Sequence, residues 1–79
     1  MRKQVRIYTR RGCHLCERVE ALLEAARGQA AFDLERVDID SDEALRARYG
    51  DLVPVVAIDG RDLFGHAMDA DAFLERLRS

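Results

Sequence analysis

Hydrophobic and polar residues alternate near the start of the chain in the pattern of a strand. The run Val5-Arg6-Ile7-Tyr8-Thr9 combines this alternation with β-branched and aromatic residues, which favour strands. Apolar residues then recur at helical spacing from His14 to Arg27, charged residues occupy the outer side, and Gly28 follows as a stop signal. The pattern predicts a strand over 5–9 and an amphipathic helix over 14–27.

The middle of the chain shows a weaker alternation. Residues 32–39 alternate, but the apolar phase shifts between Leu34 and Val37, which predicts an edge strand or a bulge. Asp40 or Ser41 then supplies the N-cap of a short helix. This helix leads into a loop that reaches the third strand.

The last part of the chain contains a hairpin and a final helix. Residues 54–58 form a nearly continuous apolar run, which predicts an interior strand with its proline at the first position, where no ladder donor is needed. Asp59-Gly60 is a hairpin turn signal, so 61–64 is the returning strand. Asp69 precedes a helix whose apolar face holds Ala70, Phe73, Leu74 and Leu77.

This order of elements, β-α-β-α-β-β-α, predicts an α/β fold. Two strands joined by a helical crossover are parallel, whereas two strands joined by a tight turn are antiparallel. The chain therefore forms a four-stranded mixed sheet flanked by three helices. At 79 residues, 48% of them hydrophobic, we expect one domain over 1–79.

Charge and hydropathy exclude some classes of protein. The net charge of −2 argues against a dedicated nucleic-acid binder. No apolar run approaches the roughly 20 residues of a membrane span, so we expect a cytoplasmic monomer with no membrane partner. Residues 1–16 carry five basic and no acidic side chains, while the remainder carries 8 basic and 15 acidic ones.

Both cysteines lie in the basic segment, at the junction between the first strand and the first helix. Cys13 and Cys16 are separated by two residues, so both sulfurs fall near a helix N-terminus, where free N–H groups and the helix dipole favour a thiolate. In a reducing compartment such a pair indicates catalysis or metal binding. A metal or iron–sulfur module, with His14 or His66 as further ligands, is the alternative to a redox site.

The strand, the Cys13-His14-Leu15-Cys16 motif, the helix and Val53-Pro54 at the third strand together resemble a small glutaredoxin-like protein of the thioredoxin-fold superfamily. The resemblance covers essentially the whole chain. It implies the sheet order second, first, third, fourth strand, with Cys13 as nucleophile and Cys16 as resolving cysteine.

The resemblance also implies an activity. A thiol–disulfide oxidoreductase of this kind reduces or exchanges protein or small-molecule disulfides, and its partner is a disulfide-containing protein or a glutathione-type thiol. It needs no metal and no cofactor beyond the redox-active cysteine pair, although glutathione is a candidate ligand. We expect Cys13 to titrate well below Cys16.

Three residues around the cysteines are candidates for tuning the thiolate. Arg10 and Arg11 resemble the basic residue that precedes the motif in glutaredoxins; they either hold the thiolate or a ligand carboxylate, or serve solubility. His14 either adds positive charge beside Cys13 or is an exposed polar residue at the first helical position.

The remaining candidates belong to the substrate side. In the family, the proline that matches Pro54 is cis and faces the cysteines, and the residue before it, here Val53, offers its backbone to the substrate. Glutathione-using members usually have threonine where Leu52 stands and two glycines where Gly65-His66 stands. Asp69 either meets an amine of the ligand or caps its own helix.

Overall fold

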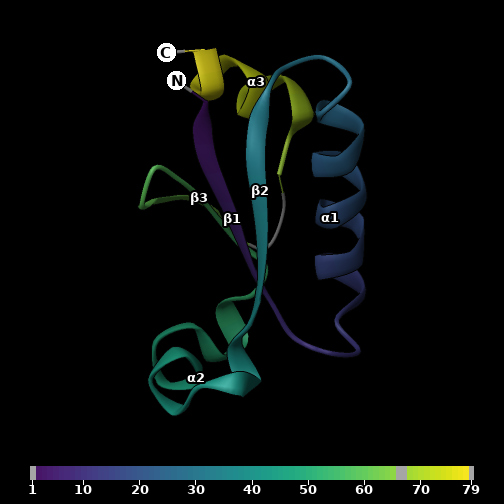
Figure 1. Cartoon of the computed structure of the whole chain (residues 1–79). Helices are drawn as coiled ribbons and strands as arrows, with labels where there is room; N and C mark the ends of the chain where they lie inside the picture. The colour runs from purple at the N-terminus through teal and green to yellow at the C-terminus, as the bar shows by residue number, and fades with distance from the viewer. Residues whose placement is uncertain (1, 66–67, 79) are drawn as a thin grey trace.

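The computed structural model describes residues 2–65 and 68–78 and contains the predicted elements in the predicted order (Figure 1). Two 3-10 turns, η1 and η2, flank the middle helix. The elements are β1 (Lys3–Thr9), α1 (His14–Ala26), β2 (Phe32–Asp38), η1 (Ile39–Ser41), α2 (Glu43–Tyr49), η2 (Gly50–Leu52), β3 (Val55–Ile58), β4 (Arg61–Gly65) and α3 (Ala70–Arg78).

The sheet has the order β2-β1-β3-β4, as the sequence predicted. Strand β1 pairs parallel with β2 and antiparallel with β3, and β3 pairs antiparallel with β4. The β1–β2 register is continuous from Lys3 opposite Phe32 to Thr9 opposite Asp38. The fold is therefore thioredoxin-like, with β1 in the interior and β2 and β4 at the edges.

The shift in apolar positions between Leu34 and Val37 of β2 does not come from a bulge in this strand. Strand β2 is an edge strand, as predicted, but the register irregularity of this sheet lies between β3 and β4, at Val56 and Ala57. Leu34 packs against the core on one face of the sheet, and Val37 packs against the core on the other face. The strand contacts a different core at each end, so its apolar residues change phase without an inserted residue.

The larger of these two cores, here called the first core, lies between the sheet and the helices α1 and α3. Its buried residues come from the five elements β1, α1, β2, β3 and α3 and from Met68 just before α3, and all are apolar. They are Val5, Ile7, Val19, Leu23, Ala26, Phe32, Val56, Ile58, Met68, Phe73, Leu74 and Leu77. Burial of apolar area on this scale is the main stabilising contribution to the fold.

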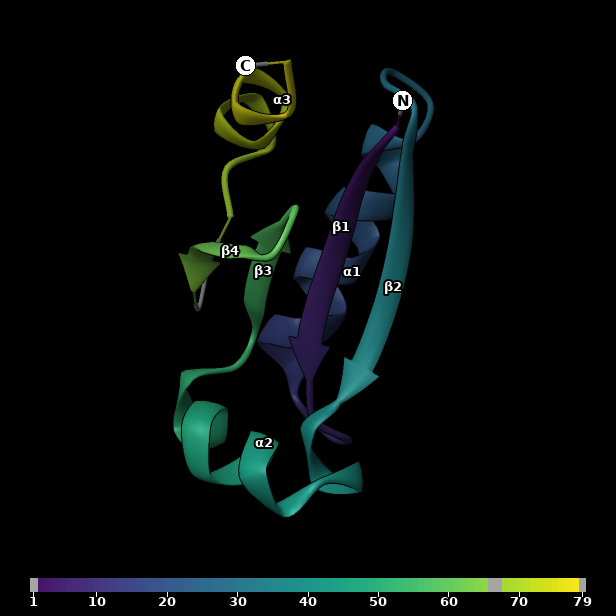
Figure 2. The same ribbon diagram turned by 60° about the vertical axis from the view of Figure 1, so that its left-hand side comes forward.

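The second core lies at the carboxyl ends of β1 and β2 and combines residues of the opposite sheet face with Cys16 of α1. It consists of Tyr8, Cys16, Ile39, Tyr49, Val53, Val55 and Ala57. Helix α2 has only seven residues and lies beyond the carboxyl ends of these strands (Figures 1 and 2). The rest of this sheet face carries exposed polar side chains, among them Arg6, whose guanidinium pairs with Glu35.

The N-cap of α2 differs from the prediction. Asp42, and neither Asp40 nor Ser41, caps the helix, because its Oδ1 accepts hydrogen bonds from the N–H groups of Ala44 (2.7 Å) and Leu45 (3.4 Å). Asp40 and Ser41 belong to η1 instead. Correspondingly, the predicted strand over 32–39 ends at Asp38, whose carboxylate caps that turn.

Other local predictions are confirmed. Asp59 and Gly60 form the hairpin turn with φ angles of 49° and 85°, the positive values that this turn requires. Phe73, Leu74 and Leu77, which belong to the predicted apolar face of the last helix, are buried in the first core. Among the described residues, none of the helices combines the length and the hydropathy that a membrane crossing needs.

Candidate active site

Cys13 occupies the N-cap of α1, directly after the turn that ends β1. Gly12 makes this turn with a φ of 78°, a conformation that side chains rarely adopt, and Cys13 itself is extended. The Sγ of Cys13 accepts a hydrogen bond from the backbone N–H of Cys16 at 3.1 Å. A sulfur therefore takes the place that a serine or aspartate oxygen fills at an ordinary N-cap.

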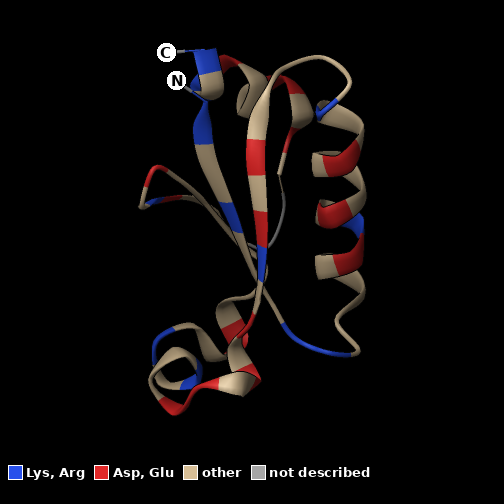
Figure 3. Ribbon diagram, viewed as in Figure 1, with Lys and Arg blue, Asp and Glu red and all other residues tan. Residues whose placement is uncertain are grey.

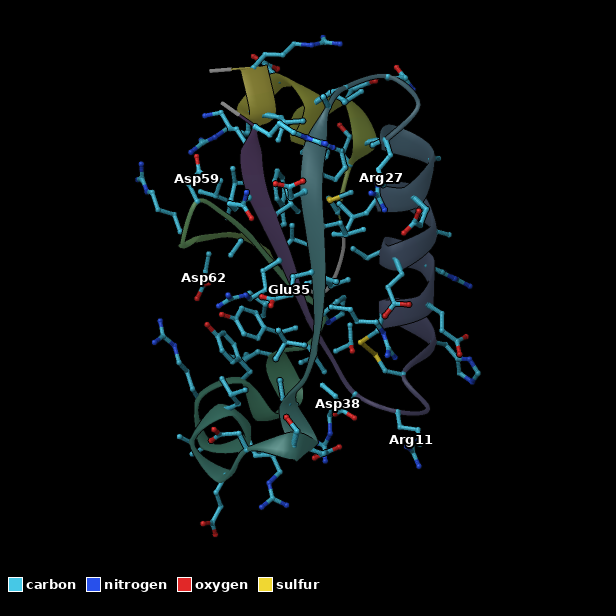
Figure 4. All side chains as sticks on the ribbon, in the orientation of Figure 1. Arg11, Arg27, Glu35, Asp38, Asp59 and Asp62 are labelled. Atoms are coloured by element: carbon cyan, nitrogen blue, oxygen red, sulfur yellow. A yellow bond between two sulfur atoms is a disulfide. The ribbon has the colours of Figure 1, made fainter. Side chains whose placement is uncertain are left out.

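The two cysteines form a disulfide but differ in exposure. Their Cα atoms are 5.2 Å apart, and the disulfide lies between the first turn of α1 and the sheet (Figure 4). Cys13 is partly exposed, whereas only 1% of Cys16 is accessible. Cys16 begins the buried stripe of α1 that continues through Val19, Leu23 and Ala26. The first cysteine is thus accessible in part, whereas the second is enclosed.

Arg10, predicted to hold the thiolate or a ligand carboxylate, forms an ion pair with Asp40. Its Nε and Nη2 donate to the two carboxylate oxygens of Asp40 at 3.2 Å and 3.0 Å, so much of its charge is matched by η1. Arg11 is exposed and extends into solvent from the basic turn between β1 and α1 (Figures 3 and 4). Arg11 also lines a shallow pocket with Asp38, Asp40 and Ser41.

His14, the first residue of α1, is almost fully exposed. Its side chain is 91% exposed, and Nδ1 lies 3.6 Å from the carboxylate of Glu17, one turn along the helix. This position fits the interpretation of His14 as an exposed polar residue at the first position of the helix.

Val53 and Pro54 are joined by a cis peptide bond, as the resemblance implied. Both residues are buried, and Val53 belongs to the second core together with Cys16, with Cys13 packed against that core. The structure therefore brings Val53-Pro54 and the cysteines together. Leu52, directly before them, is 54% exposed.

The last two candidates lie farther along the chain. Gly65 ends β4 opposite Val55, and the space where its Cβ would stand is open. Asp69 caps α3, because its Oδ2 accepts from the N–H of Ala72 at 3.3 Å. His66, which the sequence offered as a metal ligand, lies outside the described residues.

Two features near the site were not singled out from the sequence as functional. Tyr8 and Tyr49 stack with ring centroids 4.1 Å apart, and the hydroxyl of Tyr49 donates to Asp62 at 3.0 Å. Burial, followed by hydrogen bonds to Tyr8 and Asp62, raises the pKa of Tyr49 above its ordinary value. The second feature is Thr9, the buried polar residue that ends β1.

The metal-binding alternative would need three or four ligands in one place. Within residues 2–65 and 68–78, no group of three or more histidine, cysteine, aspartate or glutamate side chains gathers in a way that would hold an ion.

The comparison with protein families decides the relationship. Residues 4–78 match the model of the glutaredoxin-like domain (DUF836) family, which is nearly the whole chain. The chain belongs to this family. A relative in Mycobacterium tuberculosis, the uncharacterized protein Rv0508, is 39% identical over 66 residues, covering 77% of this chain and 68% of the relative.

Solved structures agree with this membership. Protein Ne2328 from Nitrosomonas europaea is similar with a TM-score of 0.84 and 33% identity over 98% of this chain and 93% of its own. Protein XcR50 from X. campestris is similar with a TM-score of 0.75 and 37% identity over 91% and 96%. A mutant thioredoxin from Halobacterium salinarum (TM-score 0.72, 22% identity, covering 96% and 72%) shares the fold.

Proposed function

We propose that this glutaredoxin-like chain is a thiol–disulfide oxidoreductase with Cys13 as the nucleophile and Cys16 as the resolving cysteine. The observation that carries the proposal is the unequal setting of two bonded sulfurs. Cys13 is partly exposed and its Sγ accepts a hydrogen bond from the N–H of Cys16 at 3.1 Å, whereas Cys16 is enclosed. A helix N-terminus favours the thiolate, which is the reactive form of cysteine.

The reaction proceeds by two exchanges. The Cys13 thiolate attacks one sulfur of a substrate disulfide; a mixed disulfide forms, and the other substrate sulfur leaves as a thiolate and takes a proton. Cys16 then loses its proton and attacks Cys13 Sγ, and the remaining substrate sulfur leaves. The substrate gains two electrons and two protons, and the chain keeps the Cys13–Cys16 disulfide. A dithiol, or two molecules of a monothiol such as glutathione, restores the reduced pair.

The surroundings of Cys13 favour a protein disulfide as the substrate. Two apolar side chains are exposed beside the reactive segments: Leu15, inside the motif, is 44% exposed, and Leu52, directly before Val53, is 54% exposed. Each of these side chains adjoins a reactive segment in the sequence and can contact an apolar side chain of a protein substrate there. A pocket of about 360 Å³ lined by Leu52, Val55, Phe64 and Gly65, among others, lies next to this segment and provides room for an apolar side chain.

Glutathione is the less favoured substrate, although it remains a candidate reductant. Leu52 offers no hydroxyl where the glutathione-using members have threonine, and the carboxylate of Asp69 is engaged as a helix cap. These two residues leave fewer polar groups for a charged tripeptide than those members provide.

Trapping experiments test the assignment of the two cysteines. The variants Cys13→Ser and Cys16→Ser are each mixed with a disulfide-bonded protein, and adducts are resolved by non-reducing electrophoresis and mass spectrometry. We expect Cys16→Ser to accumulate a one-to-one mixed disulfide at Cys13, because nothing resolves it, and Cys13→Ser to form none. Equal adduct formation or equal residual activity in the two variants would contradict the assignment.

A further inference from the structure

Thr9 ends a row of buried side chains on β1, and Cys16 begins a row of buried side chains on α1 that packs on the same sheet face. On β1, Val5, Ile7 and Thr9 point to the face that α1 covers, since side chains two apart share a face of a strand. On α1, Cys16 begins the stripe that packs on that face. The strand and the helix run in opposite directions because a short turn joins them. The last residue of one stripe therefore lies against the first residue of the other.

The neighbours of Thr9 within the sheet place it in the floor of the site. Its Cα partner on β2 is Asp38. On the other side, β1 and β3 pair at Tyr8 and Val55, so Pro54 follows next to Thr9. Pro54 carries no N–H and shares the α1 face with Val56, two residues on. Thr9 thus lies between these strands, on the sheet face that α1 covers.

The hydroxyl of Thr9 is enclosed and has no partner. Its residue is 0% exposed, and within the described part of the chain Oγ1 has no hydrogen bond. Buried hydroxyls are nearly always hydrogen-bonded, because an unsatisfied one loses its contacts with water without replacement. Such an atom beneath a disulfide indicates that its partner exists in the other redox state.

Resting on the function proposed above, we infer that the Thr9 hydroxyl hydrogen-bonds the Cys16 sulfur in the reduced protein. A hydroxyl can accept from a thiol and donate to a thiolate, so it can stay bonded while Cys16 gives up its proton. In the oxidised form the Cys16 sulfur has no proton to donate and accepts more weakly than a thiolate, and the Thr9 hydroxyl has no partner there. Thr9 is therefore a positioning residue that favours the reduced pair and stabilises the resolving thiolate.

The other charged and titratable groups near Cys16 have partners of their own or stay neutral, so they do not take the place of the Thr9 hydroxyl beside the Cys16 sulfur. Tyr8 from β1 and Tyr49 from α2 belong to the same core, and the raised pKa of Tyr49 keeps it neutral in the neutral pH range. Charged neighbours on the adjoining elements are in ion pairs: Arg10 with Asp40, and Glu20 of α1 with Arg36 of β2. The imidazole of His14 lies 3.6 Å from the carboxylate of Glu17. On β2, the carboxylate of Asp38, the Cα partner of Thr9, accepts a hydrogen bond from the N–H of Asp40. Cys13 is removed in one arm of the test.

The experiment compares Thr9→Val, which removes the hydroxyl but keeps the shape, with Thr9→Ser, which keeps the hydroxyl. Each variant is equilibrated with glutathione and its disulfide, and the dithiol–disulfide ratio is measured. We expect Thr9→Val to favour the disulfide about tenfold over the wild type, equivalent to a potential about 30 mV lower. Thr9→Ser should remain within about twofold of the wild type. Ile7→Val, on the same stripe, is the control for altered packing.

A second readout follows the thiol itself. In the Cys13→Ser background, Thr9→Val should raise the pKa of Cys16, observed by thiolate absorbance against pH, and Thr9→Ser should restore it. The thermal stability of Thr9→Val should be unchanged or higher when the protein is oxidised and lower when it is reduced. A role in packing alone would change both redox states in the same direction.

The outcomes separate this inference from the proposed function. If Thr9→Val and Thr9→Ser behave alike in both readouts while the wild type still exchanges disulfides, the inference about Thr9 is wrong and the function stands. If the wild type forms no mixed disulfide at Cys13, the proposed function fails whatever Thr9 does to the equilibrium.

Discussion

The hydrogen bond from the Cys16 N–H to Cys13 Sγ predicts a measurable link between thiol ionisation and stability. A hydrogen bond to a charged group contributes roughly 1.5–3 kcal/mol, and the end of a helix roughly 0.3–1 kcal/mol. Partial burial of Cys13 opposes ionisation, so we take about 2 kcal/mol as the net gain for the thiolate. A net gain of this kind lowers the pKa of Cys13 below that of a free cysteine, which is about 8.5.

The perturbation compares Cys16→Ser, which keeps the backbone donor and a single reactive thiol, with the double variant that also carries Cys13→Ser. A group whose pKa is lower in the folded state stabilises the fold above its unfolded pKa, and this contribution is lost as pH falls through the folded pKa. Between about pH 6 and about pH 9.5, the free energy of unfolding of Cys16→Ser should therefore rise by about 2 kcal/mol relative to the double variant.

The assay is denaturant unfolding under reducing conditions at a series of pH values, with thiolate absorbance as an independent titration. Serine retains the capacity to cap α1 in the double variant, so the comparison isolates the sulfur. The titration of Tyr49 and of all other groups is common to both proteins and cancels. If the two pH profiles are parallel, or if Cys13 titrates at the value of a free cysteine, the helix end does not activate this thiol.

Three further predictions concern the framework of the site. Asp42→Ala should lower the free energy of unfolding by about 1 kcal/mol through loss of the α2 cap, seen as a melting temperature roughly 4–8 °C lower. Tyr49→Phe removes the hydrogen bond to Asp62 and should lower the free energy of unfolding at neutral pH. Because folding raises the pKa of Tyr49, the free energy of unfolding of the wild type should fall above about pH 10, and that of the variant should fall less. Leu23→Ala, at a fully buried position, should lower the free energy of unfolding by about 2–5 kcal/mol in chemical denaturation. Leu22→Ala, at the exposed position beside it, is the control, and an equal loss of stability there would contradict this description of the core.

The order and pairing of the elements were predictable because strong local signals agree with one another. The alternation in β1, the helical stripe of α1 and the Asp59-Gly60 turn each favour a single structure. The cap of α2 was not predictable at the same level. Asp40, Ser41 and Asp42 are all good N-caps, and the choice among them depends on how η1 turns with Ile39 fully buried.

The cysteines of the site were predictable from their spacing at a strand–helix junction, but their surroundings were not. The pairing of Arg10 with Asp40 joins residues 30 positions apart, and it exists because the β1–β2 register sets Thr9 opposite Asp38. Thr9 itself gives no signal in the sequence, because threonine is common in strands. Its unpartnered hydroxyl becomes visible only when burial and hydrogen bonds are known.

The sheet face that α1 and α3 leave uncovered affects how the sequence of this domain can change over evolution. Gln4 and Arg6 on β1 are exposed and bonded to Asp33 and Glu35 on β2. Such surface pairs contribute roughly 0–1 kcal/mol each, so replacing one partner costs little. Substitutions should therefore accumulate on this face among relatives, while the face that carries Thr9 and the first core tolerates few. The surface charge of the domain can then vary without change to the dithiol.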